Sequence, residues 1–103
     1  MKEFVKEELQ SLIIKTIAAQ PSLLKKNQSY SIKYYMDDLV RNFFNIDTNI
    51  VREAIKVFID EEYYKTKPFA YLKAIVSNKE KERQIEIEKN KRRFGSIPQN
   101  VKQ

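Results

Sequence analysis

A single glycine, Gly95, in a chain of 103 residues is the feature that most restricts the possible folds. Tight β-hairpins need residues that adopt positive φ, and glycine is the usual one, so a sheet built from hairpins is disfavoured. Helices joined by short polar loops need few glycines. The chain is long enough for one modest hydrophobic core. The sequence therefore predicts an all-α protein with one small domain.

Apolar residues recur at steps of three and four in three segments, which is the spacing of one helix face. The pattern predicts helices over about residues 2–19, from Ser29 or Ser31 to about residue 44, and from Asp47 or Thr48 to residue 61 or 62. The expected inward face of the first helix is Val5, Leu9, Leu12, Ile13 and Ile17, and that of the third is Val51, Ala54, Ile55 and Phe58. Asn49, Arg52, Glu53 and Lys56 fall on the outward face of the third helix.

The second and third predicted helices, with residues 45–47 between them, have the layout of a helix-turn-helix. The small Ala54 lets another helix pack closely, and long polar side chains on the outer face can reach a DNA groove. A plain three-helix bundle shows the same pattern, so the third helix is either a groove-reading helix or a structural one. A winged-helix-like version requires a hairpin after Tyr63, and residues 63–67 are either a minimal β-wing or an extended link.

Positive charge is concentrated in the C-terminal part of the chain. Residues 1–63 carry nine Lys/Arg and ten Asp/Glu, a net charge of −1, whereas residues 64–103 carry eleven and four, a net charge of +7. After Ser77 the apolar pattern fades and charges alternate in sign. This predicts a long charged C-terminal helix that starts near Pro68 and extends beyond the globule, followed by disorder from about Gly95. We expect a helix-turn-helix-like domain at 1–78 and a basic helix with a disordered tail at 79–103.

A neutral helical body with a strongly basic arm is typical of a protein that binds nucleic acid, here single- or double-stranded DNA. The predicted contacts are Asn49, Arg52, Lys56, Lys65, Lys67, Lys73, Lys79, Lys81, Arg83, Lys89, Lys91, Arg92 and Arg93. Tyr34 and Tyr64 belong to adjacent tyrosine pairs, in which one member should face outward and could stack on an unpaired base. The plainer alternatives are a solubilising tail and half-buried tyrosines with their hydroxyl groups in water.

The composition disfavours catalysis, metal binding and membrane association. The chain has neither Cys nor His, which removes thiolate ligands and the commonest general base, and one glycine cannot build a phosphate-binding loop. The acidic clusters at 37–38 and 60–62 could hold Mg²⁺, but neighbours on one helix point in different directions, so solvated surface is the favoured interpretation. We expect no enzyme, cofactor or metal. There is no signal peptide and no apolar run of about 20 residues, which indicates a cytoplasmic protein.

Residues 67–78, Lys-Pro-Phe-Ala-Tyr-Leu-Lys-Ala-Ile-Val-Ser-Asn, resemble the Pro-x-x-Tyr-Leu-x-x-Ile-Leu-x-Asn stretch near the end of DnaD-like domains and of related plasmid and phage replication proteins. Val76 stands where that pattern has Leu, and Lys79 replaces the aromatic residue, commonly Trp, that often follows the Asn. Residues 30–64 are similar to the winged-helix domains that often precede such a segment. In that family an all-helical domain ends in this helix and a charged tail implicated in DNA binding.

The resemblance implies an accessory role in replication, in which the protein assists a helicase, primase or polymerase. The abundance of Lys, Asn and Ile indicates an AT-rich genome, such as that of a plasmid, phage or genomic island. Two alternatives stay open: a protein–protein adaptor subunit of a replication enzyme with auxiliary DNA contact, and a sequence-specific helix-turn-helix transcription regulator that dimerises on a palindromic site. The sequence fixes neither the protein partner nor the oligomeric state.

Overall fold

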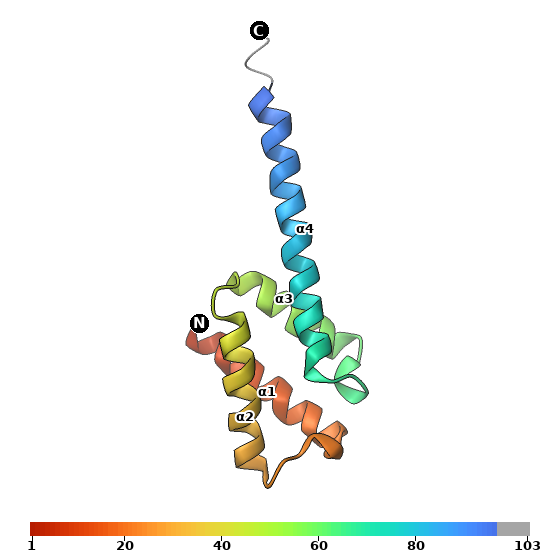
Figure 1. Ribbon diagram of the computed structural model, residues 1–103. Helices are drawn as coiled ribbons and strands as arrows, with labels where there is room; N and C mark the ends of the chain where they lie inside the picture. Colours follow the sequence, from red (N-terminus) through yellow and green to blue (C-terminus); the bar gives the residue numbers. More distant parts are fainter. Residues whose placement is uncertain (97–103) are drawn as a thin grey trace.

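The structure is a computed structural model that describes the backbone of residues 1–96 and the side chains of residues 1–90. Its elements are α1 (Glu3–Ala19), the 3₁₀ turn η1 (Pro21–Leu23), α2 (Gln28–Phe43), α3 (Thr48–Asp60), the 3₁₀ turn η2 (Tyr63–Lys65) and α4 (Phe69–Ser96). The described chain contains no strand (Figure 1), which confirms the all-α prediction. None of the described helices is long and apolar enough to cross a membrane.

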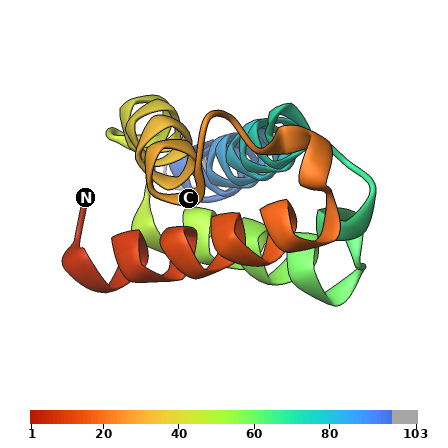
Figure 2. The same ribbon diagram turned by 90° about the horizontal axis from the view of Figure 1, so that it is seen from below.

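Helix α1 contacts α2, α3 and both 3₁₀ turns. Helix α3 in turn packs against α4. Figure 2 shows α1 crossing one side of the body, with α2 and α4 on the other side. The predicted inward faces of α1 and α3 are confirmed, since all of their members are buried. The full core is Val5, Leu9, Leu12, Ile13, Ile17, Leu39, Phe43, Ile50, Val51, Ala54, Ile55, Phe58, Phe69, Leu72 and Val76.

The helix starts are fixed by capping side chains. Of the two residues predicted to start the third helix, Asp47 caps α3, because its carboxylate accepts a hydrogen bond of 2.8 Å from the Asn49 N–H. The predicted start of α2 at Ser29 or Ser31 is wrong, because Asn27, which has extended backbone angles, caps the helix and accepts from the Tyr30 N–H at 2.8 Å. Ser31 lies inside the first turn of α2 and is buried. Helix α2 therefore begins earlier than its apolar pattern indicated.

Residues 63–67 form neither of the two alternatives that the sequence left open, a minimal β-wing or an extended link. Residues Tyr63–Lys65 form a 3₁₀ turn, which follows Glu62 in the left-handed conformation with φ of 60°. The Gln20 side chain holds this turn against the end of α1, since its amide Nε2 donates to the carbonyl oxygens of Tyr64 at 2.7 Å and Lys67 at 2.9 Å. These carbonyl groups accept hydrogen bonds from the Gln20 side chain and so do not pair with a second strand.

Helix α4 has 28 residues and extends away from the body (Figure 1), as predicted. Its first turns carry the core residues Phe69, Leu72 and Val76, whereas every residue from Lys81 to Asn90 is exposed. The expected domain boundary after residue 78 falls within this continuous helix. Gly95 and Ser96 belong to α4, and the rest of the predicted disordered tail, residues 97–103, lies outside the described residues.

Candidate nucleic-acid interface

The outward face of α3 is tied to α1 by an ion pair. The Nε atom of Arg52 donates a hydrogen bond to Oε1 of Glu8, and the Nη2 atom donates one to Oε2, both at 3.0 Å. The guanidinium carbon also lies 5.0 Å from the centre of the Phe4 ring. The hydrogen bond and the charge of Glu8 raise the pKa of Arg52. In this arrangement two of the five N–H donors of the Arg52 guanidinium group are bonded to Glu8.

A groove of about 750 Å³ runs between α1 and α3 beside this pair. It is lined by Phe4, Glu7, Glu8, Ser11, Asn49, Arg52, Glu53, Ile55, Lys56 and Ile59. Its three carboxylates outnumber its two cations, and Lys56 is paired with Asp60 at 2.8 Å, which raises the pKa of Lys56. Asn49 is exposed at the first turn of α3. The acidic surroundings disfavour a close approach of DNA phosphates to this face.

Three further predicted contacts connect α4 to the other helices. Lys73 pairs with Asp38 of α2 at 2.7 Å. Lys79 pairs with Glu53 of α3 at 3.7 Å, and Arg83 pairs with Asp47 at 3.0 Å. The Asn49 N–H, together with the charge of Arg83, lowers the pKa of Asp47. These cations orient α4 on the body, and Arg83 is the last of them along the helix.

Lys81 and the cations of α4 beyond Arg83 have a different environment. Lys81 and Lys89 are exposed, and neither forms an ion pair within the part of the chain that the structure describes. Lys91, Arg92 and Arg93 belong to the helical backbone of α4, but their side chains lie outside the described residues. Lys81 and Lys89 are thus exposed to solvent and do not take part in the ion pairs that hold Lys73, Lys79 and Arg83 to the body.

The predicted stacking residues differ from each other in accessibility. Tyr64 is half-buried, with the Nζ atoms of Lys15 and Lys65 at 4.9 and 5.9 Å from its ring centre. Lys65 is also paired with Glu62 at 2.9 Å, which raises its pKa. Lys67 lies 5.2 Å from the ring centre of Tyr71. Tyr34, in contrast, is 48 % exposed at the start of α2.

Sequence reasoning missed the residues that surround Tyr34. The Nζ of Lys25 lies 4.7 Å from its ring centre, and the Nζ of Lys26 lies 4.8 Å from that of Tyr30. Tyr30 is 42 % exposed. The only sequence signal was a run of lysines without carboxylates before α2, because the contacts depend on how the loop folds back on the helix.

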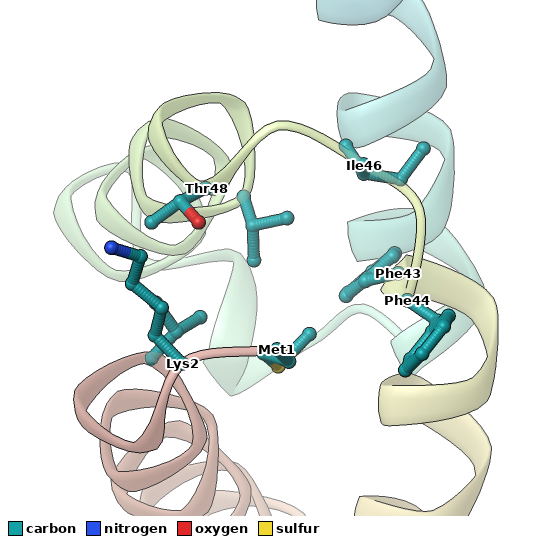
Figure 3. Close-up of a pocket in the computed structure, with 8 residues that line it drawn as sticks. Met1, Lys2, Phe43, Phe44, Ile46 and Thr48 are labelled. Carbon is teal, nitrogen blue, oxygen red and sulfur yellow. The ribbon is translucent and has the colours of Figure 1, made fainter.

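A smaller hollow of about 410 Å³ lies where the N-terminal end of α1 meets the turn between α2 and α3. Figure 3 shows Met1 and Lys2 on one side of it and Phe43, Phe44 and Ile46 on the other. Phe44 is 64 % exposed at this site. The hollow is lined mainly by apolar side chains, so its character is that of a protein contact and not of a phosphate site.

Four of the five carboxylates of the two acidic clusters form ion pairs with lysines. Asp37 and Asp38 pair with Lys33 and Lys73, and Asp60 and Glu62 pair with Lys56 and Lys65. Among the described residues, no three carboxylates come close enough together to hold a metal ion.

Comparisons with protein-family models, with curated proteins and with solved structures find no match to this chain.

Proposed function

We propose that this protein is a non-catalytic DNA-binding protein that contacts the phosphate backbone without reading the base sequence. The observation that carries the proposal is the projection of α4 from the body after Arg83, in a part of the chain (residues 84–103) with five Lys/Arg and two Asp/Glu, a net charge of +3. Cations on a projecting helix can approach phosphates without bringing the acidic groove with them. Affinity from such contacts is electrostatic and independent of sequence.

The pairing of Arg52 supports sequence-independent binding over groove reading. For α3 to enter a major groove, Arg52 would have to leave Glu8, and both Glu8 and Glu53 would then face the phosphates. We propose that α2, the turn and α3 form a helix-turn-helix-like unit that supports α4. A transcription regulator that reads DNA through α3 is less compatible with this charge arrangement.

We further propose an accessory role in the replication of a mobile element, in the cytoplasm, beside a helicase, primase or polymerase. This part rests on the resemblance of residues 67–78 to DnaD-like proteins. Leu72 and Val76 of that segment are core residues, and the Tyr71 ring packs against that of Tyr63 with 4.8 Å between centres. The motif thus has a structural role here, and DNA binding depends on the helix that follows it.

The test is truncation of the chain after Gln84. The truncated protein should stay folded, because no core residue lies beyond that point in the described chain. It should bind duplex DNA at least about tenfold more weakly at moderate salt, since each lost phosphate contact removes close to one unit from the salt slope. Fluorescence anisotropy at several salt concentrations measures both quantities. Equal affinity of truncated and full-length protein would contradict the proposal.

A pair of charge variants provides a matched control on the same helix. Lys81→Gln with Lys89→Gln should weaken binding to unrelated duplexes equally. Glu86→Gln with Glu88→Gln should instead leave binding unchanged or strengthen it, since it removes negative charge from the same exposed segment. Arg52→Ala should not change the preference among duplexes. A loss confined to one sequence would favour the transcription-regulator alternative.

The adaptor alternative is favoured by one observation, the apolar hollow beside the exposed Phe44. In that case Phe44→Ala should abolish co-purification with a replication protein, while the arm variants should have no effect on it.

A further inference from the structure

Two exposed tyrosines in the first turns of α2 each have the ammonium group of a lysine over the ring. The rings of Tyr30 and Tyr34 lie one helical turn apart, with centres separated by 6.4 Å and planes inclined by 24°. The ammonium groups of Lys26 and Lys25 lie over these rings at 4.8 and 4.7 Å from their centres. Each ring therefore has a cation on it, and the two rings present nearly parallel aromatic faces. We refer to these four residues as the tyrosine–lysine patch.

The loop that supplies the lysines is held by a buried side chain. The hydroxyl of Ser31 accepts a hydrogen bond of 2.7 Å from the Lys25 N–H. The same oxygen lies 2.8 Å from the carbonyl oxygens of Lys25 and of Asn27, and its single proton is directed toward these two acceptors. Lys26 adopts the left-handed conformation with φ of 42°. This change of direction lets consecutive lysines reach different rings.

The charge around the patch favours an anionic ligand. Between Gln20 and Met36 the chain has three lysines and no acidic residue. Lys33 is paired with Asp37, whereas Lys25 and Lys26 form no ion pair with any described carboxylate. Their ammonium groups are held only by the tyrosine rings, a weak attraction at exposed sites. They are thus available for a stronger interaction with phosphate.

We infer that the tyrosine–lysine patch is a stacking site for single-stranded nucleic acid. An unpaired base replaces each ammonium group on its tyrosine ring, and the displaced lysine moves to the phosphate of the same strand. Base stacking on aromatic side chains with cations along the backbone is the chemistry of sequence-tolerant single-strand binding. A duplex does not fit this chemistry, because its bases are stacked on one another and do not offer free faces.

The patch is separate from the projecting part of α4. The start of α2 lies at the opposite end of the body from the C-terminal end of α4 (Figure 1). The inference rests on the proposed function in that the protein binds nucleic acid, but it assigns the single-strand contact to a different surface. The two sites can therefore be tested independently.

The first experiment compares Tyr30→Leu with Tyr34→Leu in one chain against Tyr30→Phe with Tyr34→Phe. Full-length proteins are titrated with an oligothymidylate, an oligouridylate and a duplex of mixed sequence, and circular dichroism verifies folding. Stacking of one base corresponds to about a five- to 150-fold change in affinity. The Leu variant should lose at least about tenfold on single strands and less than about twofold on the duplex. The Phe variant keeps its rings and should bind as wild type.

A second variant tests the lysines. Lys25→Gln with Lys26→Gln should lower the salt slope on single strands by up to about 1.4, from about 0.7 for each phosphate contact, and leave the duplex slope unchanged. A comparison of the two oligonucleotides shows whether the strand that fits is DNA or RNA, since only RNA carries the 2′-hydroxyl group.

Photocrosslinking locates the contact directly. An oligonucleotide that contains 5-iodouracil should crosslink to a stacked tyrosine, and trypsin separates the two candidates into peptides 27–33, with Tyr30, and 34–41, with Tyr34. Adducts on other peptides only, or unchanged single-strand affinity of the Leu variant, would overturn the inference and make the patch a protein contact. If the wild type binds the duplex while these results are negative, only this inference fails. If it binds neither duplex nor single strands, the proposed function fails as well.

Discussion

Replacement of Phe58 by alanine should be among the most destabilising changes in this protein. Phe58 lies on α3 and is fully buried, and it is among the largest of the fully buried side chains. Helix α3 packs against both α1 and α4, and the Phe58 ring lies 6.4 Å, centre to centre, from the ring of Tyr63. Loss of the ring removes apolar contacts on both sides and leaves a cavity that rigid helices fill only in part.

The free energy of unfolding should fall by about 3–5 kcal/mol, which is the usual range when a fully buried Phe is replaced by Ala. With about 4–8 °C for each kcal/mol in a domain of this size, the unfolding midpoint should fall by about 12–40 °C. Urea and thermal unfolding followed by circular dichroism measure both values. Many domains have a total stability of only about 5–15 kcal/mol, so the variant should be marginally folded.

Phe44→Ala is the matched control, because it is the same chemical change at a residue that is 64 % exposed. It should alter the free energy of unfolding by less than about 0.5 kcal/mol. If Phe58→Ala cost no more than Phe44→Ala, the inward face of α3 would be assigned wrongly. The exposure of Arg52 and the groove between α1 and α3 would then have to be reconsidered as well.

Three further predictions concern the cap of α3, the hydrogen bonds of Gln20 at the end of α1 and the part of α4 beyond Arg83. The folded-state pKa of Asp47 lies below its ordinary value of 3.8. The stability that its carboxylate contributes is therefore present above that value and is lost as the pH falls through the lowered pKa. Asp47→Asn should reduce the acid sensitivity of unfolding, measured in urea between about pH 5 and pH 2. Gln20→Ala removes two hydrogen bonds, one to Tyr64 in η2 and one to Lys67 after it, and should cost about 1–3 kcal/mol in urea unfolding. Gln10→Ala at an exposed position of α1 should cost less than about 0.5 kcal/mol. Amide hydrogen exchange should be slow around Leu72 and fast beyond Arg83, because isolated helices shorter than about 12–15 residues are marginal in water; uniform protection along α4 would indicate that the arm packs against another molecule.

Local sequence patterns determined most of the fold. The apolar steps of three and four within residues 2–19 and 47–61 identified the helices and their buried faces, because helical periodicity depends only on neighbours along the chain. The start of α3 was predicted at Asp47 or Thr48, and Asp47 supplies the cap. The start of α2 was predicted at Ser29 or Ser31, whereas Asn27 supplies the cap and the hydroxyl of Ser31 is bonded to the Lys25 backbone, a contact that depends on how the loop folds back.

The candidate site was determined by the sequence only in part. Net charge and its location in residues 64–103 are properties of the sequence, as is the projection of a charged helix that has too few apolar residues to be buried. Which cations stay available to a ligand depends on distances between segments far apart in the chain. Arg52 pairs with Glu8, 44 residues earlier in the chain, and Arg83 pairs with Asp47 of a different segment. Helical periodicity predicts neither pair.

The tertiary structure alone decided the pairing of Arg52 and the position of the lysines over Tyr30 and Tyr34. An ion pair or a cation–π contact requires two side chains within a few ångströms, so it exists only after α1 is packed against α3, or after the loop before α2 is bent by Lys26 and held by Ser31. Composition and periodicity report the average environment of a residue, and they carry no information about which partner it meets. For this protein the sequence determined that the body is helical and the arm is basic, and the tertiary packing decided which of the basic and aromatic side chains are paired within the protein and which are exposed to solvent.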